Sequence, residues 1–351
     1  MAHLEETLAK IRPLDREAMA IARHHQNNLA KPLDSLGRLE EIAVQLAGIG
    51  GDPFYKIDGK AVIIAAADHG VLEEPGYPYP QAVTTQMMVN LIGGGSAVNV
   101  IARQVGSRVI AVDVGLAEEL IGLPNIVRKR VRSSTNNITT GPAMTLEEAR
   151  ESVENGISIV SEEIGRGADI IAVGEIGTGN MVSGLAILES FVEGSMGMIS
   201  DTKDLVSSEA AWNLQHAQLA VKRNEPDGQD ALDVLAKVGG VEIGMIAGII
   251  LGAAALRCPV VLDGLITGVA ALIASGLSET SADYLLASHS SSEDSHTFLL
   301  KHLGLIPLLN LKIQLGQGTG AVLGMSVIEA AARCQIEMTT HDQAGVAGPS
   351  E

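Results

Sequence analysis

The sequence predicts an α/β fold in which helices cover both faces of a parallel sheet. Apolar residues make up 46% of the 351 residues and aromatic residues only 2%, so small and branched aliphatic side chains must build the core. Short, continuous apolar runs alternate along the chain with segments of helical periodicity, as expected for parallel strands buried on both faces. Several of these runs end in polar or glycine residues, which is typical of the carboxyl edge of such a sheet.

The first fifty residues are predicted to be helical. Leu4, Leu8 and Ile11 show loose helical spacing before Pro13, and a clear period of three to four residues runs from Leu36 to Leu46. Between these segments, residues 31–40 are interpreted as a structural joint, in which Ser35 could cap the second helix.

Strands and helices then alternate. Strands are predicted at 61–67, 109–114, 170–173, 259–262 and 284–287, with a short one within the loop 125–142 and a strand-like apolar segment at 308–315. Helices are predicted at 83–90, from Ser96, from a capped start at Thr145 to about Gly165, and at 212–221, 230–238, 243–256, 269–274 and 321–332. Residues 73–81 and 193–208 are predicted to be loops, the first of them a possible lid.

Composition excludes several classes of protein. The formal net charge of −18 argues against a nucleic-acid partner, since such binding needs a basic surface. Cys258 and Cys334 have no metal-binding spacing and indicate no disulfide framework. The most apolar stretch, residues 243–256, is too short to cross a membrane, and residues 1–10 lack the apolar core of a secretory signal. A soluble, cytoplasmic protein without membrane contact is therefore expected.

Two glycine-rich turns stand out. Gly316, Gln317, Gly318, Thr319 and Gly320 lie between an apolar segment and a helix, and a similar turn with Gly174, Gly177, Gly179 and Asn180 follows the apolar run 170–173. Either turn alone is explained equally well by a tight strand-to-helix connection or by an anion site at a helix N-terminus. Two such turns, one carrying Glu175 and the other an amide, indicate one pocket at one edge of the sheet.

Polar residues recur at the ends of the predicted strands. Any one of them is explained by an ordinary loop or cap, but together they predict a single crevice: Asp68, His69, Asp113, Glu175, Asp263, Ser288, His289 and Gln317. His69 and His289 are the titratable candidates, and neither has a metal-binding spacing. The sequence contains no nucleophile elbow and no dinucleotide fingerprint, so triad and dinucleotide chemistry are not supported.

These residues carry a resemblance over nearly the whole chain. The sequence resembles the nicotinate-nucleotide:dimethylbenzimidazole phosphoribosyltransferase family, which acts in the assembly of the lower ligand of cobamides. The matching blocks occur in order: Lys31–Pro32 with 35–40, 67–71, 79–81, 83–87, 112–115, Gly174–Glu175 with Gly177, Gly179 and Asn180, 237–240, 259–264, Ser288–His289 with Ser291 and Glu293, and 318–321.

The resemblance implies a doubly wound, Rossmann-like parallel sheet with a small helical domain formed by both chain ends, and a dimer. It places residues 1–50 and 325–351 in the helical domain and 51–324 in the α/β phosphoribosyltransferase domain. The implied reaction transfers the phosphoribosyl group of nicotinate mononucleotide to an aromatic base such as dimethylbenzimidazole, with inversion at C1′, release of nicotinate, and no cofactor or metal. The implied substrate-binding residues are Tyr79, Gln86, Met87, Gly174, Gly177, Gly179, Asn180, Asp263, Ser291, Leu315, Gly316, Gly318, Thr319 and Gly320, with Glu175 and Gln317 at the catalytic positions.

The sequence also departs from the family pattern. The resemblance implies a glutamate as general base at position 317, where this chain has Gln317, and an amide cannot act as a base near neutral pH. Arginine is expected at Gln314 and within the stretch 194–198, and a lysine is expected between 207 and 221. None of these three positions carries the expected cation.

Three interpretations therefore stay open. The chain is an active transferase that uses Glu175 or another group as base, with dimethylbenzimidazole, phenol or p-cresol as acceptor. Alternatively, it is a catalytically weak subunit that completes a paralogue's pocket, as in the heterodimeric phenol- and p-cresol-activating members. In the third interpretation it binds a nucleotide or an aromatic base without turnover.

Overall fold

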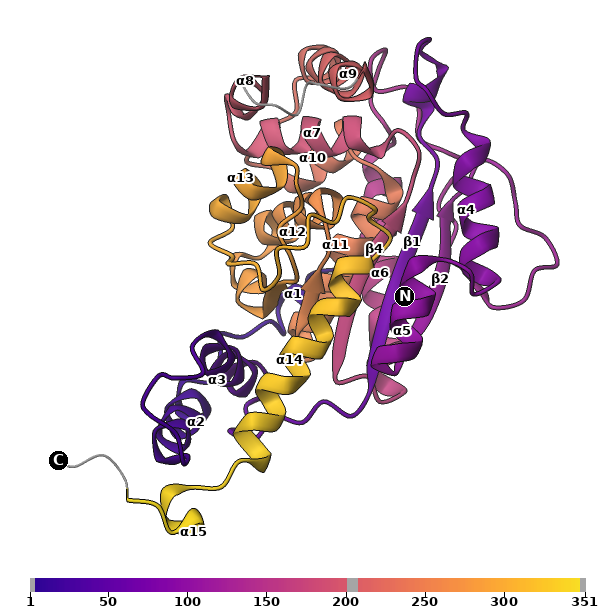
Figure 1. The fold of residues 1–351 in the computed structure, drawn as a ribbon. Coiled ribbons are helices and arrows are strands. Elements are labelled where there is room, and N and C mark those ends of the chain that lie inside the picture. The colour runs from indigo at the N-terminus through magenta and orange to yellow at the C-terminus, as the bar shows by residue number, and fades with distance from the viewer. Residues whose placement is uncertain (1–3, 201–207, 348–351) are drawn as a thin grey trace.

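A single parallel sheet organises the molecule. The computed structural model describes residues 4–200 and 208–347 (Figure 1). Six strands run in the order β3–β2–β1–β4–β5–β6, and every neighbouring pair is parallel. Their bounds are β1 Lys60–Ala67, β2 Ser107–Gly115, β3 Ile126–Arg128, β4 Ile170–Ile176, β5 Val260–Leu262 and β6 Leu285–Ala287. The strand order is that of a doubly wound sheet. The strand bounds confirm the strands predicted before position 300 to within three residues at each end.

The sheet has a switch point between its two central strands. From β1 the chain proceeds outward to β2 and β3 on one side, then returns to place β4, β5 and β6 on the other. Lys60 of β1 pairs with Ser107 of β2 and with Ile170 of β4. Because the connections leave β1 and β4 in opposite directions, a crevice opens above the carboxyl ends of these strands.

Helices cover both faces, as predicted. Ala61, Ile63 and Ala65 of β1 pack on one side against one group of helices, whereas Val62 and Ile64 face the other group. The first group consists of α6 Leu146–Gly165, α7 Asn180–Phe191, α9 Ser208–Asn224, α10 Ala231–Val238, α11 Val241–Ala255, α12 Leu265–Leu277 and α13 Asp294–His302. The second group consists of α3 Arg38–Gly50, α4 Ala82–Ile92, α5 Ala97–Val105 and α14 Thr319–Glu337. The alternation of β1 side chains therefore supplies both core layers.

Helix α14 connects the site edge of the sheet to the amino-terminal helices. It runs without a break past α3 toward α2 Arg16–Asn28 (Figure 1). Ile42 and Leu46 of α3 share one buried cluster with Met325 and Ile328 of α14, together with residues of β1 and β4. The short helices α1 Leu4–Leu8 and α15 His341–Ala344 complete the two ends of the described chain. The predicted domain boundary at residue 325 lies inside α14. The division of the chain into two domains stays a prediction.

Helices α6 and α11 pack with almost no side chain between them. A Cβ added at Gly156 would lie 2.0 Å from the Met245 carbonyl oxygen, and one at Gly248 would lie 1.9 Å from the Val153 carbonyl oxygen. All residues of α11 up to Ala254 are buried. Small residues thus let the two backbones approach closely, which explains the glycine and alanine content of the 241–255 segment.

Some predicted elements were wrong. Residues 308–315 form no strand but an extended loop with one bridge between Leu309 and His289, and Leu311 and Leu315 are more than half exposed. The loop predicted at 193–208 contains the helix α8 Ser195–Ser200, and its residues 201–207 lie outside the described part. Gly37, not Ser35, is the N-cap of α3. Helix α13 was not predicted, because its sequence is mostly polar and lacks a clear apolar period.

Membrane insertion of the described helices is not indicated. Within residues 4–200 and 208–347, no helix combines the length and the apolar character needed to span a bilayer. Helix α11, which contains most of the most apolar stretch of the sequence, is 15 residues long and lies in the protein core between α6 and α12.

The close packing of α6 and α11 predicts a stability effect. Gly248→Ala is expected to lower the free energy of unfolding by about 1–3 kcal/mol or more, because the added methyl group overlaps the Val153 backbone. Urea unfolding followed by circular dichroism measures this change. Gly165→Ala, at the end of α6 where a Cβ meets nothing within 4 Å, is the control and should be neutral or slightly stabilising. Equal effects of the two substitutions would contradict the packing argument.

Candidate active site

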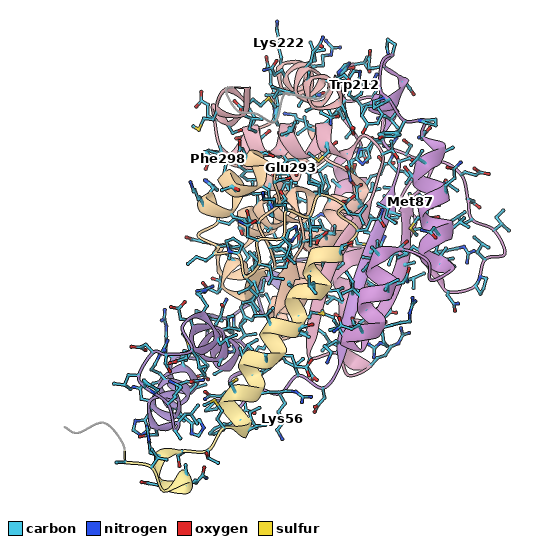
Figure 2. The ribbon with its side chains drawn as sticks, viewed as in Figure 1. Lys56, Met87, Trp212, Lys222, Glu293 and Phe298 are labelled. Atoms are coloured by element: carbon cyan, nitrogen blue, oxygen red, sulfur yellow. The ribbon has the colours of Figure 1, made fainter. Side chains whose placement is uncertain are left out.

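A cavity of about 1020 Å³ opens at the carboxyl edge of the sheet. Its walls come from the end of β4 and the start of α7, from the first turn of α12, and from the segment 313–317. Residues of α4, of α9 and of the segment before α13 close the remaining sides. Met87 of α4 and Glu293 before α13 line this cavity, and both are labelled in Figure 2. Parts of the chain that are far apart in sequence therefore meet here, as expected at a switch point.

The glycine turn at 316–320 lies directly on the backbone of β4. A Cβ added at Gly174 would lie 2.3 Å from the Gly318 amide nitrogen, so only glycine fits at position 174. Gly318 has a φ of +75°, and a Cβ there would meet Ile64 of β1 at 2.9 Å. Both glycines are required by this close approach of two backbones, and the turn is thereby fixed above the two central strands.

Asp263 ties this turn to the end of β5. Its Oδ2 accepts a hydrogen bond from the Gly318 amide and its Oδ1 accepts one from the Ala321 amide, each at 2.9 Å. Burial raises the pKa of this carboxyl, whereas His289 and the amides at the start of α14 favour its charged form. His289 lies on the same side, with its Nδ1 4.0 Å from Asp263 Oδ1. A Cβ at Gly320 would overlap the His289 ring, so the third glycine of the turn makes room for this histidine.

Gln317 occupies a strained backbone conformation. Its φ is +60°, a left-handed value that costs a non-glycine residue about 1–3 kcal/mol. Its side chain is almost fully buried and lies among the residues that line the cavity. The strain persists because Gly316 and Gly318 on either side also have left-handed φ values and Asp263 holds the turn. The turn thus presents the residue at position 317 to the cavity.

Glu175 is the carboxyl that faces the cavity from β4. Its Oε2 accepts a hydrogen bond from Asn180 Nδ2 at 2.5 Å, and its Oε1 lies 2.9 Å from where a Cβ of Gly316 would be. Burial, reinforced by the nearby charge of Glu242, raises the pKa of Glu175 to about 8. A carboxyl with this pKa holds its proton at neutral pH and becomes a strong base when ionised.

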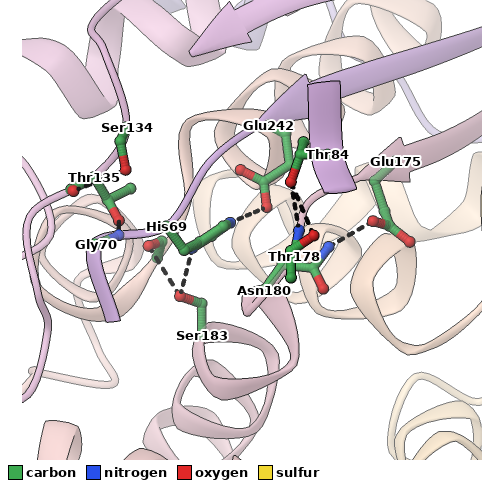
Figure 3. A network of polar contacts seen from close by, with 11 residues as sticks. His69, Gly70, Thr84, Ser134, Thr135, Glu175, Thr178, Asn180, Ser183 and Glu242 are labelled. Carbon is green, nitrogen blue, oxygen red and sulfur yellow. Dashed lines mark hydrogen bonds and ion pairs between the residues drawn. The ribbon is translucent and has the colours of Figure 1, made fainter. Parts of the chain in front are cut away.

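A buried polar network lies behind Glu175 (Figure 3). His69 Nε2 and Glu242 Oε1 are 2.9 Å apart, and both side chains are almost completely buried. Burial works against a charged imidazole, but the nearby acidic side chains of Glu242, Asp68 and Glu175 together outweigh burial and raise the pKa of His69. Thr84 of α4 donates to Thr178 Oγ1 at 2.9 Å and accepts from the Thr178 amide, which joins α4 to the turn after β4.

Part of the cavity wall is aromatic and apolar. The Tyr77 ring lies 4.8 Å from the Trp212 ring and 6.3 Å from the Tyr79 ring, between centroids. Trp212 Nε1 donates to the Pro75 carbonyl oxygen at 3.0 Å, which joins α9 to the segment after β1. Trp212 itself does not line the cavity, but Tyr77 and Tyr79 do, and with Met87, Met181, Leu185 and Leu214 they form a surface suited to a flat aromatic ligand.

Among the Asp, Glu, Lys and Arg side chains of the described residues, only acidic ones line the cavity. Glu175, Glu209, Asp263 and Glu293 line it, and no lysine or arginine of the described residues does. The N-termini of α7, α12 and α14 all begin at its wall, after Gly179, Gly264 and Gly318. Within the described residues, the positive ends of these three helices are therefore the groups best placed to attract an anion here. In the same part of the chain, no cluster of three or more His, Cys, Asp or Glu side chains suits a metal ion.

Comparison with known proteins decides the family. Residues 11–346 match the model of a family described as phosphoribosyltransferase. The chain belongs to this family. The nicotinate-nucleotide–dimethylbenzimidazole phosphoribosyltransferase of Desulforudis audaxviator is 48% identical over 347 residues, 98% of each chain. That of Dehalococcoides mccartyi is 46% identical over 99% of each.

Solved structures of the family agree with the fold. The crystal structure of the corresponding phosphoribosyltransferase from Thermus thermophilus superposes with a TM-score of 0.88 at 38% sequence identity. The match covers 95% of this chain and 99% of the other. The resemblance inferred from the sequence motifs is thereby confirmed, as is the doubly wound α/β fold.

The structure brings together most of the residues expected for a phosphoribosyltransferase site. Those that line the cavity are Tyr79, Met87, Glu175, Gly177, Asn180, Asp263, Ser291, Leu315, Gly316 and Gln317. Gly174, Gly179, Gly318, Thr319 and Gly320 lie directly beneath, where they shape the two turns. Gln86 is exposed on α4 and lies outside the cavity lining. Asp113 instead bonds its own loop, accepting from the Leu116 amide. Their roles in the reaction stay predictions.

Sequence reasoning missed part of the site. Glu209, Asn213 and Leu214 of α9 line the cavity, but they belong to no recognisable motif. Glu242 was also missed, although the sequence held a signal for it. It is the only charged residue in the apolar helix α11, and such a residue is buried only when it has a partner.

The anchoring role of Asp263 predicts a large stability effect. Asp263→Asn keeps one acceptor oxygen and turns an amide group toward the second buried N–H, so the free energy of unfolding should fall by about 2–3 kcal/mol. Asp230→Asn is the control, since Asp230 caps the exposed start of α10 and asparagine caps equally well. Chemical unfolding of both variants gives the comparison. Similar small losses in both would show that Asp263 does not hold the turn.

Proposed function

We propose that this chain transfers the phosphoribosyl group of nicotinate mononucleotide to an aromatic lower-ligand base in cobamide assembly, in the cytoplasm. In this reaction the C1′–N bond to nicotinate breaks, and nicotinate leaves with the electron pair. A new bond forms from C1′ to the acceptor with inversion, and the acceptor's proton passes to a base. The observation that carries the proposal is the cavity itself, because a carboxyl and a glycine turn at the family's motif positions line it together with aromatic side chains.

Two kinds of group in the cavity wall suit the aromatic and the phosphate parts of the substrates. The aromatic side chains Tyr77 and Tyr79, with Met87, offer flat and polarisable surfaces to the acceptor ring. The helix N-termini after Gly179, Gly264 and Gly318 offer partial positive charge to a phosphate. A net charge of −18 on the chain does not prevent this, since backbone dipoles act locally.

Glu175 is proposed as the group that accepts the proton. Gln317 has no basicity at neutral pH, and the remaining carboxyl near the glycine turn, Asp263, is held by two backbone amides. Glu175 faces the cavity and keeps one oxygen away from Asn180, beside Gly316. With a pKa of about 8, roughly one Glu175 in ten is ionised at pH 7.

A turnover assay tests the proposal. The purified chain, given nicotinate mononucleotide and either dimethylbenzimidazole or p-cresol, should release nicotinate and form the riboside phosphate of the acceptor. The activity should rise about tenfold per pH unit up to about pH 8 and then level, because the ionised fraction of Glu175 grows in that window. Glu175→Gln should lower the rate by about 10²–10⁴-fold and abolish this rise. A variant with unchanged rate and pH profile would remove Glu175 from the proposed role.

The neutral residues of the site favour a second candidate function. Gln317 stands at the base position, and no arginine or lysine of the described residues lines the cavity. Both features suit a weak subunit that pairs with a paralogue in a heterodimer, in place of a homodimer. Turnover that appears only after adding a paralogue with glutamate at the equivalent of position 317 would support this function. Thermal stabilisation by ligand, with no turnover in either setting, would leave a binding protein.

Gln317→Glu is the sharpest probe of the missing base. The turn already presents position 317 to the cavity, so a carboxylate there needs no rearrangement of the backbone. If proton transfer limits the reaction, the rate at pH 7 should rise by at least tenfold, measured as nicotinate release. Gln314→Glu adds the same charge to a more exposed residue of the cavity wall and serves as the control. No change in rate would mean that the base is not limiting.

A further inference from the structure

Glu209 lines the cavity beside its aromatic side chains and has no role in the reaction as proposed so far. It lies in the first turn of α9, and Ala210, Asn213 and Leu214 line the cavity from the same face of that helix. A carboxylate that is partly buried among apolar groups is unfavourable unless a hydrogen bond compensates. The contacts of Glu209 therefore indicate what it does.

The partner of Glu209 is the hydroxyl group of Tyr77. Tyr77 Oη donates a hydrogen bond to Glu209 Oε1 at 3.0 Å. Burial and the Glu209 carboxylate both raise the pKa of Tyr77, so the hydroxyl keeps its proton and remains the donor. Hydrogen bonds to carboxylates are stronger than those between neutral groups. This one joins residues 132 positions apart and connects the segment after β1 to α9.

The Tyr77 ring is held by α9 from a second direction. Its centroid lies 4.8 Å from that of Trp212, which is labelled in Figure 2, and the two ring planes are tilted by 58°. Contacts between aromatic rings tolerate a range of tilts, whereas a hydrogen bond is directional. The ring contact therefore limits where the Tyr77 ring lies, and the bond from its hydroxyl to Glu209 fixes how the ring is turned.

The segment that carries Tyr77 is also attached independently of α9. Glu74 Oε1 accepts hydrogen bonds from Asn137 Nδ2 at 2.8 Å and from Thr139 Oγ1 at 2.7 Å. These contacts hold the segment to the loop that follows β3 and do not involve Glu209. Loss of the Glu209 contact is therefore expected to release the Tyr77 ring without releasing the segment as a whole.

We propose that Glu209 is a positioning residue for the aromatic acceptor, which it orients by holding the Tyr77 ring in the cavity wall. The inference rests on the proposed function, in which the acceptor ring packs against Tyr77, Tyr79 and Met87. Transfer with inversion needs the acceptor's nucleophilic atom about 3–3.5 Å from C1′ and opposite the leaving nicotinate. A Tyr77 ring that turns freely lowers the population of acceptor molecules in this geometry. Glu209 acts on the acceptor only through Tyr77.

Steady-state kinetics with each substrate varied in turn test the inference. Glu209→Ala should raise the KM for dimethylbenzimidazole and for p-cresol about tenfold, because the hydrogen bond that fixes the ring is lost. The KM for nicotinate mononucleotide should stay within about twofold, since uniform loss of binding is confined to the acceptor. Tyr77→Phe, which keeps the ring and removes the hydroxyl, should have the same effect. Glu209→Gln keeps an acceptor oxygen and should restore most of the natural KM.

A double variant shows whether Glu209 acts through Tyr77. Glu209→Ala combined with Tyr77→Phe should raise the acceptor KM no more than either change alone, because both remove the same contact. If the two effects multiply to about a hundredfold, Glu209 and Tyr77 act separately and the inference is overturned. It is equally overturned if Tyr77→Phe leaves the acceptor KM unchanged while Glu209→Ala raises it, since Glu209 would then contact the acceptor itself.

Gln218→Ala provides the matched control on the same helix. Gln218 is exposed on α9 and lies outside the cavity lining. Its replacement reports any general effect of changing a polar side chain of α9, and both KM values should stay those of the natural chain. An equal rise of the acceptor KM in Gln218→Ala and in Glu209→Ala would also contradict the inference.

Calorimetric titration separates the inference from the proposed function. Binding of dimethylbenzimidazole and of p-cresol to the chain is measured without nicotinate mononucleotide, so that no turnover is needed. If the natural chain releases no nicotinate but Glu209→Ala and Tyr77→Phe weaken acceptor binding about tenfold, the inference stands and the assigned activity fails. If the chain turns over and neither substitution changes acceptor binding or KM, the activity stands and the inference fails. A natural chain that neither turns over nor binds an acceptor contradicts both.

Discussion

The contact between the Asp263 carboxylate and the amides of Gly318 and Ala321 is the constraint on which the site depends. It holds the glycine turn against β4 so tightly that no side chain fits at Gly174 or Gly318. The same contact starts α14, which runs from the site to the amino-terminal helices. The backbone strain at Gln317 is carried by this anchored turn. One buried acid thus couples the cavity to both ends of the described chain.

Much of the fold could be predicted from the sequence, because its strands are buried on both faces. In a chain with so few aromatic residues, continuous aliphatic runs such as 61–67 predict strands that are buried on both faces of a parallel sheet. The same rule failed at 308–315, where apolar residues lie in an extended loop beside His289 and are partly exposed. Helix α13 was missed because its sequence is mostly polar and shows no clear apolar period. Local pattern shows whether a segment is apolar, but tertiary contacts decide whether it joins the sheet.

The site was predicted to a similar degree. Glu175 and Asp263 could be recognised because each lies at the end of an apolar strand at the carboxyl edge, where the fold collects such residues, and Gln317 because it lies in a glycine turn before a helix. The α9 residues that complete the cavity have no such position in the sequence, since tertiary contacts, among them the packing of α9 on α7 and of Trp212 on Tyr77, bring them to it. The coupling of Glu242 to His69 joins residues 173 positions apart, and no local pattern could show it.

The scarcity of aromatic residues gives the protein a built-in optical reporter. Trp212 is the sole tryptophan of the chain, and its indole contacts the His216 ring, with centroids 3.8 Å apart, and the ring of Tyr77, which lines the cavity. Indole emission is sensitive to the polarity of its surroundings. Tryptophan fluorescence from the unlabelled protein therefore originates from this one indole, beside a tyrosine of the cavity wall. A rearrangement of Tyr77 or of the segment around Pro75 is expected to change this emission, without any added dye.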